Sequence, residues 1–137
     1  MPESEREVLA NINDHVPAGM AFGPFEPHVA EHTVAGGEVL RVAGLTFDVR
    51  FTPGHSPGHV SYVARGEDAV FSGDVLFEGS VGRVDLPGGD WATLRASIQG
   101  LLDELPPQTT VYPGHMGITT LAAERANNPF LREPALR

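Results

Sequence analysis

The sequence predicts an α/β (α+β) domain, a mixed β-sheet with flanking helices, from two observations. From residue 38 onward, short runs rich in β-branched and aromatic residues alternate with glycine and proline turns, a pattern typical of strands. Between the last two of these runs, a longer stretch has apolar residues at helical spacing. With 137 residues the chain is long enough to bury a substantial core, and we expect one domain at most.

The first expected elements are a helix and a loop. Ser4 followed by Glu7 is a capping-box pattern, and apolar residues recur on one helical face, so we expect a helix over residues 4–15 with Pro17 as its stop. The stretch over residues 18–31, rich in glycine and proline, has no period and is expected to form a loop. The strands that follow are expected, in chain order, at residues 39–42, 46–51, 60–64, 69–71 and 110–112.

The most clearly predicted helix begins after Asp90. This residue can cap the helix, two glycines precede it, and Pro106-Pro107 mark its end. A last helical piece is expected over residues 120–127. The apolar face of the longer helix carries Leu94, Ile98, Leu101, Leu102 and Leu105.

Composition argues against several classes of protein. Nine basic against eighteen acidic side chains give a net charge of −9, which repels phosphate backbones and anionic membranes, so neither nucleic acid nor a membrane is an expected partner. There is no cysteine, so any metal must be bound by histidine and carboxylate. No apolar run is long enough to span a membrane and the first residues are acidic, so we expect an unexported, cytoplasmic protein.

Three strand-like runs end in a glycine followed by a side chain that can bind a metal: His55, Asp74 and His115. Residues just beyond strand ends project from rigid elements into a crevice, so we expect the three to cluster. Two imidazoles and a carboxylate suit zinc, or else iron or manganese, whereas the plainer alternative is that each is an ordinary turn residue. His59, four residues after His55, is expected to shape the loop or to orient a ligand rather than to bind a metal itself.

Four short segments stand out in order along the chain: Thr-Pro-Gly-His-Ser-Pro-Gly-His (52–59), Phe-Ser-Gly-Asp-Val-Leu-Phe (71–77), Gly-Ser-Val-Gly-Arg-Val-Asp-Leu-Pro (79–87) and Tyr-Pro-Gly-His (112–115). Together, over about residues 38–131, they resemble the later motifs of the metallo-β-lactamase superfamily, closest to glyoxalase II-like (hydroxyacylglutathione hydrolase-like) enzymes. The resemblance implies an αββα sandwich, of which this chain supplies mainly the C-terminal half.

Site roles follow from the resemblance. His55 would be the third histidine of the first metal site, Asp74 the carboxylate that bridges both metals in catalysis, and His115 the remaining histidine of the second site. Arg83 matches a position where relatives place a basic residue that can bind a substrate carboxylate, a role suited to a guanidinium. The alternative for Arg83 is a surface salt bridge.

One motif of the family is absent. The sequence contains no His-X-His-X-Asp-His, and His15, His28 and His32 are too dispersed to replace it as ligands. We therefore expect residues 1–137 to be a single partial domain that lacks the N-terminal half carrying that motif, and truncation is the simplest account.

The resemblance implies an activity for the intact form: metal-dependent hydrolysis of a thioester, a hydroxyacyl-thiol conjugate, by a hydroxide that two zinc ions activate. This chain alone is expected to be nearly inactive, because three ligands leave both sites incomplete. One alternative is an iron-dependent persulfide dioxygenase-like enzyme, which shares the Gly-Arg-X-Asp stretch, and another is a non-catalytic module.

Two partners are expected. One is the small-molecule acyl-thiol substrate. The other is a second copy of the chain, because half a sandwich leaves one apolar sheet face uncovered. Candidates for that face are Val39, Val49, Phe51, Val60, Tyr62 and Val70.

Overall fold

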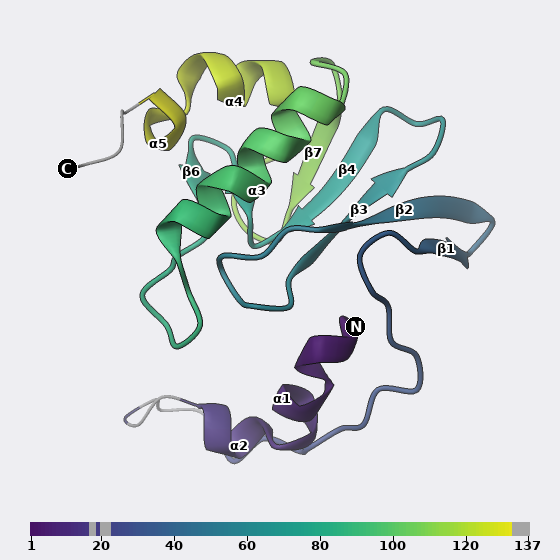
Figure 1. Ribbon diagram of the computed structural model, residues 1–137, viewed down its shortest axis with the longest axis vertical. Coiled ribbons are helices and arrows are strands. Elements are labelled where there is room, and N and C mark those ends of the chain that lie inside the picture. Colours follow the sequence, from purple (N-terminus) through teal and green to yellow (C-terminus); the bar gives the residue numbers. More distant parts are fainter. Residues whose placement is uncertain (17–18, 20–22, 133–137) are drawn as a thin grey trace.

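The computed structural model describes residues 1–16, 19 and 23–132, and within them the chain forms a six-stranded sheet (Figure 1). The strand order is β1-β2-β3-β4-β7-β8, and a separate two-stranded sheet pairs β5 with β6. Strand β7 lies parallel to β4, whereas the other neighbouring strands are antiparallel, which confirms the predicted mixed sheet. The strands are β1 (Val39–Val42), β2 (Leu45–Phe51), β3 (Val60–Ala64), β4 (Ala69–Gly73), β5 (Leu76–Phe77), β6 (Ser80–Val81), β7 (Thr110–Pro113) and β8 (Thr119–Thr120).

Sequence alternation predicted the longer strands and missed the short ones. Strand β2 begins one residue before its predicted start, at Leu45, and β4 continues past its predicted end to Gly73. Strands β5, β6 and β8 were not predicted, because two residues carry no alternation.

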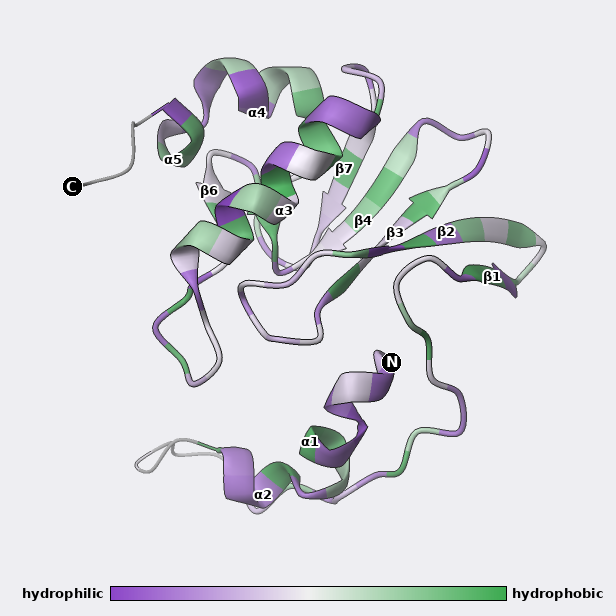
Figure 2. Cartoon of the chain, in the orientation of Figure 1, coloured by the Kyte–Doolittle hydropathy of each residue, from purple (hydrophilic) through white to green (hydrophobic). Residues whose placement is uncertain are grey.

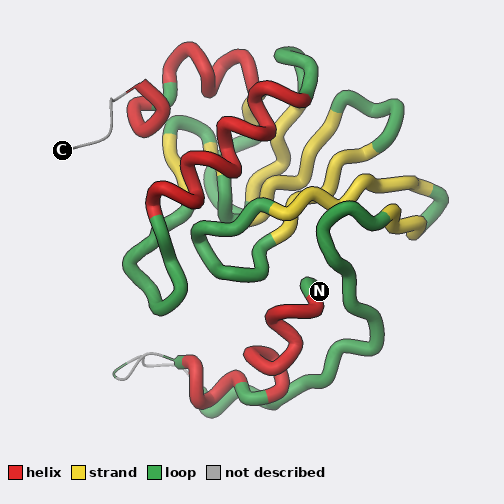
Figure 3. Tube along the Cα trace, in the orientation of Figure 1, coloured by secondary structure: helices red, strands yellow, loops and turns green. Residues whose placement is uncertain are grey.

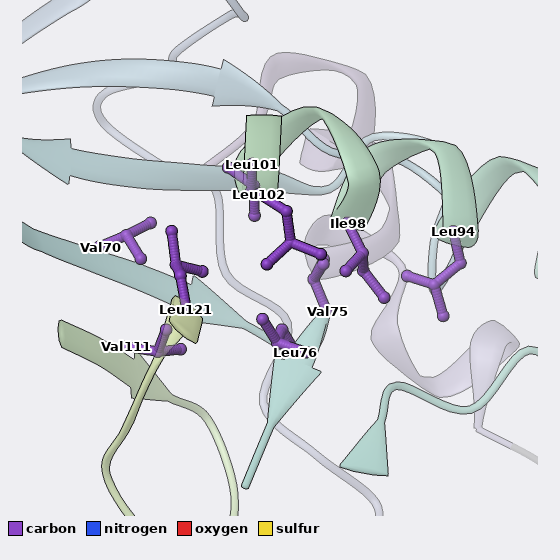
Figure 4. Packing of buried hydrophobic residues seen from close by; sticks show 9 residues of the cluster. All are labelled: Val70, Val75, Leu76, Leu94, Ile98, Leu101, Leu102, Val111 and Leu121. Carbon is purple, nitrogen blue, oxygen red and sulfur yellow. The ribbon is translucent and has the colours of Figure 1, made fainter. Parts of the chain in front are cut away.

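Helix α3 (Trp91–Glu104) covers one face of the sheet. Asp90 caps it as predicted, since its Oδ1 accepts a hydrogen bond from the Thr93 backbone N–H at 2.7 Å. Figure 4 shows the apolar side chains of α3 packed toward those of β4, β5 and β7. Each aliphatic side chain buried in this way contributes about 1.5–3 kcal/mol. The cluster consists of Val70, Val75, Leu76, Leu94, Ile98, Leu101, Leu102, Val111 and Leu121.

Two further helices follow the last strand, α4 (Leu121–Asn127) and α5 (Pro129–Arg132). They lie beside α3 in Figure 1, and α4 begins where the sequence predicted a helix. The side chain of Thr120 caps α4 by accepting a hydrogen bond from the Ala123 backbone N–H. Leu121 joins the cluster under α3, so α4 is fixed to the same side of the sheet.

The opposite face of the sheet carries a row of aromatic rings. The strand register places Phe47, Tyr62, Phe71 and Tyr112 on this face, with neighbouring ring centroids 5.1–6.3 Å apart. Phe71 and Tyr112 remain 41% and 38% exposed. We call this surface the aromatic face, and it contains a hollow of about 260 Å³ lined by Leu40, Val42, Phe47, Tyr62 and Phe71.

The prediction of which residues form the uncovered face was partly wrong. Val70 is buried under α3, and Val39 pairs with Asp48, so both point to the helix-covered side. The other four candidates lie on the side of the aromatic face, as the pairing of β2 with β3 shows, but Val49 and Val60 are buried there in a cluster with Val34. Phe51 is exposed and Tyr62 is half-buried, so the prediction of an uncovered surface was right only for this part of the face. Alternation separates two sets of residues but does not say which set faces the helix, and only the register with neighbouring strands does.

The single helix predicted over residues 4–15 was also wrong. The structure has a 3₁₀ turn η1 (Glu3–Glu5) and two short helices, α1 (Arg6–Ala10) and α2 (Ile12–His15), and no side chain caps the start of η1 or α1. The break lies at Asn11, whose backbone leaves the helical region at φ −121° and ψ 39°. Its backbone N–H and its side-chain Nδ2 both donate to the Glu7 carbonyl, at 2.9 and 3.1 Å. The expected stop at Pro17 lies outside the described residues.

The N-terminal segment, residues 1–16, 19 and 23–34 of the described chain, contacts the sheet through Val34, which packs against Val49 and Val60. Pro2 forms a bridge with Val34, and the Glu5 carboxylate accepts a hydrogen bond from the Gly58 backbone N–H at 3.0 Å. None of the residues of η1, α1 or α2 is buried, and these helices lie apart from α3 and the sheet in Figure 3. Strands β3 and β4 carry mostly hydrophobic colouring in Figure 2, whereas α2 is mostly hydrophilic. Within the described ranges, none of the helices has the length and apolarity that a membrane crossing requires.

Candidate metal centre

The three predicted ligands follow strands that run in the same direction. Strand β3 is antiparallel to both β2 and β4, and β7 is parallel to β4, so the C-terminal ends of β2, β4 and β7 meet at one edge of the sheet. His55 lies in the loop after β2, Asp74 directly follows β4, and His115 lies two residues beyond β7. The predicted clustering of these side chains is therefore a consequence of sheet topology.

The two histidines face different oxygens of the same carboxylate. His55 Nε2 lies 3.5 Å from Asp74 Oδ2, and His115 Nε2 lies 3.3 Å from Asp74 Oδ1. Two ligand atoms held on a tetrahedral zinc at about 2.0–2.2 Å are themselves about 3.4 Å apart, so both spacings suit a shared metal. The donor set therefore fits a carboxylate that bridges two neighbouring metal positions.

Hydrogen bonding fixes which nitrogen of His55 is free. Its Nδ1 lies 2.8 Å from the Arg83 carbonyl oxygen, and a carbonyl only accepts, so Nδ1 carries the proton. A neutral ring then has its lone pair on Nε2, the atom that faces Asp74. This is the usual arrangement of a metal-bound histidine, whose second nitrogen donates to a backbone carbonyl or carboxylate.

The described residues contain no group of three or more histidine, aspartate or glutamate side chains that could hold one metal ion. The distances give the reason. Asp74 directs one oxygen to each histidine, so a metal ion between either histidine and Asp74 would receive only one nitrogen and one oxygen from these residues. His15, His28 and His32, which were not expected to be ligands, are exposed in the N-terminal segment.

His59 lies behind this cluster. Its Nε2 accepts a hydrogen bond from the Asp74 backbone N–H at 3.1 Å, and its Nδ1 lies 3.0 Å from Thr52 Oγ1. Burial, and then the nearby His55, lower the pKa of His59 below its usual value. The ring is therefore held in its neutral form against the backbone of Asp74.

Arg83 lies exposed on the segment between β6 and α3. Its Nε and Nη2 donate to the two carboxylate oxygens of Asp85 at 2.6 and 2.7 Å. This bidentate hydrogen bonding lowers the pKa of the Asp85 carboxyl. The salt bridge named as the alternative for Arg83 is present, and binding of a substrate carboxylate there stays a prediction.

The glycines of the motifs serve two different purposes. Gly73 has a φ of 53°, which favours glycine, and a Cβ built on it would lie 2.6 Å from His59 Nε2. A Cβ on Gly114 would lie 2.5 Å from Asp74 Oδ1. Gly114 is thus required by close approach to the carboxylate, a reason that the sequence did not reveal.

Sequence reasoning missed a buried carboxylate that holds the turn between β5 and β6. Glu124 on α4 is 3% exposed and accepts hydrogen bonds from the Gly79 backbone N–H, from Asn128 Nδ2 and from Thr119 Oγ1. Gly79 lies in the turn between β5 and β6, four residues before Arg83. Thr119 and Asn128 are local partners of this glutamate, but the Gly79 N–H is 45 residues away and is brought to it only by the fold.

The sequence pattern of the metallo-beta-lactamase superfamily matches residues 4–115 of the chain. The "Probable metallo-hydrolase YqgX" of Bacillus subtilis is 46% identical over 102 residues, which cover 74% of this chain and 48% of YqgX. The "Hydroxyacylglutathione hydrolase GloC" of Haemophilus influenzae is 41% identical over 95 residues, 69% of this chain and 45% of GloC. The chain thus spans about half the length of these relatives.

Solved structures agree with the sequence relatives. The crystal structure of the BLEG-1 B3 metallo-beta-lactamase matches 97% of this chain and 64% of that protein, with a TM-score of 0.82 and 40% identity. The crystal structure of TTHA1623 in a di-iron-bound form matches 77% of this chain and 50% of that protein, with a TM-score of 0.68 and 48% identity. The fold described above is therefore shared with proteins to which the chain is 40–48% identical.

Proposed function

This chain belongs to the metallo-β-lactamase superfamily, and on that premise we propose that it carries part of the metal centre of a thioester hydrolase acting on hydroxyacyl-thiol conjugates. The observation that supports the metal centre is the arrangement of His55 and His115 on separate oxygens of Asp74. The name of the relative GloC supports the choice of substrate. The lack of cysteine fits a carboxylate as the bridging ligand.

The chain's own residues would each do part of the chemistry. Asp74 holds its two oxygens toward two positions, and His55 offers Nε2 because its Nδ1–H is bonded to the Arg83 carbonyl. When bound, divalent metal ions lower the pKa of water toward neutrality and polarise a carbonyl group. The backbone of Arg83 is hydrogen-bonded to His55. The Arg83 guanidinium would bind a carboxylate of the thiol part of the substrate if one of its two hydrogen bonds to Asp85 were broken.

Metal binding tests the proposal without any assumption about substrate. We expect metal-stripped protein to bind Zn²⁺, with the tetrahedral absorption of Co²⁺ as a second probe. Asp74→Asn and His55→Gln should each weaken binding by more than tenfold, since each removes a ligand. His32→Gln is the matched control, because His32 is an exposed histidine outside the cluster. Equal affinity in all four proteins would contradict the site.

Turnover of a hydroxyacylglutathione thioester tests the activity. Alone, this chain should turn over far more slowly than GloC, because three ligands leave both metal positions incomplete. A rate comparable with that of GloC, removed by a chelator, would show that other residues complete the site. Addition of an N-terminal half that carries His-X-His-X-Asp-His should restore turnover, and Asp74→Ala should abolish it.

A second candidate function is iron-dependent persulfide dioxygenation. The observation that favours it is the iron bound in the crystal structure of the similar protein TTHA1623. The Gly82-Arg83-Val84-Asp85 stretch is compatible with both candidate functions, so it does not distinguish them. Metal analysis separates them: iron together with oxygen consumption on a persulfide favours the second candidate, and zinc with thioester cleavage favours the first.

A further inference from the structure

One peptide group at the metal centre is held from both ends. The peptide that joins Gly73 to Asp74 accepts a hydrogen bond at its carbonyl from the Gly114 backbone N–H, at 2.8 Å. Its N–H donates to His59 Nε2 at 3.1 Å. The loops that carry His55, Asp74 and His115 are thus tied together through a single peptide plane.

The hydrogen bonds around His59 allow only one tautomer of its ring. A backbone N–H can only donate, so His59 Nε2 has no proton and Nδ1 must carry it. Nδ1–H then donates to Thr52 Oγ1 at 3.0 Å, and the Thr52 hydroxyl is hydrogen-bonded in turn to Ser61 Oγ at 2.9 Å. Thr52 and Ser61 are buried, so water does not offer their hydroxyls an easy alternative.

The clamp matters because Gly73 does not hold the peptide by itself. A glycine adopts positive and negative φ with similar ease, so rotation of the 73–74 peptide meets little intrinsic resistance. Such a rotation would turn the Asp74 side chain away from one or both histidines. The carboxylate is about a third exposed and is not walled in by packing.

We propose that His59, as the neutral Nδ1–H tautomer, is a positioning residue that clamps the Gly73–Asp74 peptide and so directs both oxygens of Asp74 to the two metal positions. The functional consequence rests on the proposed metal centre, whereas the clamp itself is a property of the folded chain. The Asp74 N–H fixes the tautomer, and Thr52 supports it by accepting a hydrogen bond from Nδ1–H.

Nuclear magnetic resonance of the metal-free chain tests the clamp directly. The ¹⁵N shifts of His59 should show a protonated Nδ1 and an unprotonated Nε2, and the Asp74 amide should be protected from hydrogen exchange. A protonated Nε2, or an Asp74 amide that exchanges as fast as an exposed one, would overturn the proposal whether or not the protein binds metal.

Two variants, each with an amide in place of one ring nitrogen, separate a positioning role of His59 from a role in packing alone. In His59→Gln the side-chain oxygen reaches the place of Nε2 and can still accept from Asp74, whereas in His59→Asn the amide reaches only the place of Nδ1 and can still donate to Thr52. We expect His59→Gln to keep Asp74 amide protection and most of the Zn²⁺ affinity, and His59→Asn to lose both, with about 10–100-fold weaker binding.

Equal losses in the two variants would show that His59 only fills space, and would overturn the proposal. If the wild-type chain binds no Zn²⁺, the proposed function fails, while the contrast in Asp74 amide protection between the variants still decides on the clamp. Circular dichroism of both variants checks that they are folded before the comparison is made.

Discussion

Replacement of Glu124 by alanine would remove three hydrogen-bond acceptor contacts from the interior. The carboxylate accepts from the Gly79 backbone N–H at 3.0 Å, from Asn128 Nδ2 at 2.8 Å and from Thr119 Oγ1 at 2.7 Å. In Glu124→Ala one N–H of the buried Asn128 amide loses its acceptor, although Nδ2 keeps its bond to the Ser80 carbonyl, whereas Gly79 is exposed and the Thr119 hydroxyl can rotate. A buried donor left without a partner costs about 1–3 kcal/mol, so we expect a loss of about 2–4 kcal/mol in the free energy of unfolding once the small cavity is included.

Glutamine at position 124 should behave very differently. Its side-chain oxygen can take the place of Oε2 and accept from both Gly79 and Asn128. Its amide can take the place of Oε1 and donate to Thr119 Oγ1, since a hydroxyl both donates and accepts. The expected loss for Glu124→Gln is about 1 kcal/mol or less, because weaker neutral hydrogen bonds are offset by the removal of a buried charge.

Guanidinium denaturation at pH 7, followed by circular dichroism, measures both variants. Gln99→Ala, on the exposed side of α3, is the control for a substitution that only breaks a surface hydrogen bond to Asp103. A loss for Glu124→Gln as large as that for Glu124→Ala would refute the reasoning, because it would mean that the negative charge matters and not the acceptor geometry. A loss below about 1 kcal/mol for alanine would mean that water reaches the freed donors.

Four further outcomes follow from features described above. Gly100→Ala, in the interior of α3 with open space around its Cβ, should stabilise the protein by about 0.5–1 kcal/mol in the same denaturation assay. Gly73→Ala should instead cost more than about 2 kcal/mol, since its Cβ meets His59 and its φ is positive. Burial raises the pKa of Tyr62, so in Tyr112→Phe the remaining phenol should ionise above its usual value of about 10 in an absorbance titration. The raised pKa stabilises the folded chain while Tyr62 is protonated, so this contribution is fully present below pH about 10 and is lost as the pH rises through the raised pKa. Ionisation of Tyr62 at the ordinary pKa would contradict its burial. Finally, we propose that a second copy of the chain covers the aromatic face, so sedimentation should show a dimer that Phe71→Asp dissociates, whereas a monomer that binds no hydrophobic dye would contradict this proposal.

Much of the fold was accessible from the sequence because the signals were local and repeated. Helix α3 has a cap, a stop and an apolar stripe within one continuous stretch, and each feature alone predicts the same element. The prediction of one N-terminal helix was wrong at Asn11, where the backbone leaves the helical region in the middle of a weak periodic pattern.

Only part of the candidate site could be predicted from the sequence. The ligand candidates could be predicted because His55, Asp74 and His115 follow strand ends, and strand ends that point the same way converge. The tautomers of His55 and His59 could not, because they depend on the Arg83 carbonyl and the Asp74 amide, which only the folded chain brings near. Glu124 was missed because its contact with Gly79 exists only in the folded chain, although its contacts with Thr119 and Asn128 are local.

The parallel pairing of β4 with β7 has a consequence for how the chain reaches its native state. Between the two strands lie residues 74–109, with the β5–β6 hairpin, Arg83 and α3, and parallel strands can pair only after such a crossover has closed. Closing a long segment costs entropy before any strand contact is gained, which makes this step a slow one in folding. The bond from Gly114 to Gly73 forms across the same junction, so Asp74 and His115 meet only after closure. In a stopped-flow refolding experiment, the rate of metal binding should therefore report the rate at which β4 pairs with β7. Intermediates in which α3 is formed but β4 and β7 are unpaired should bind no metal.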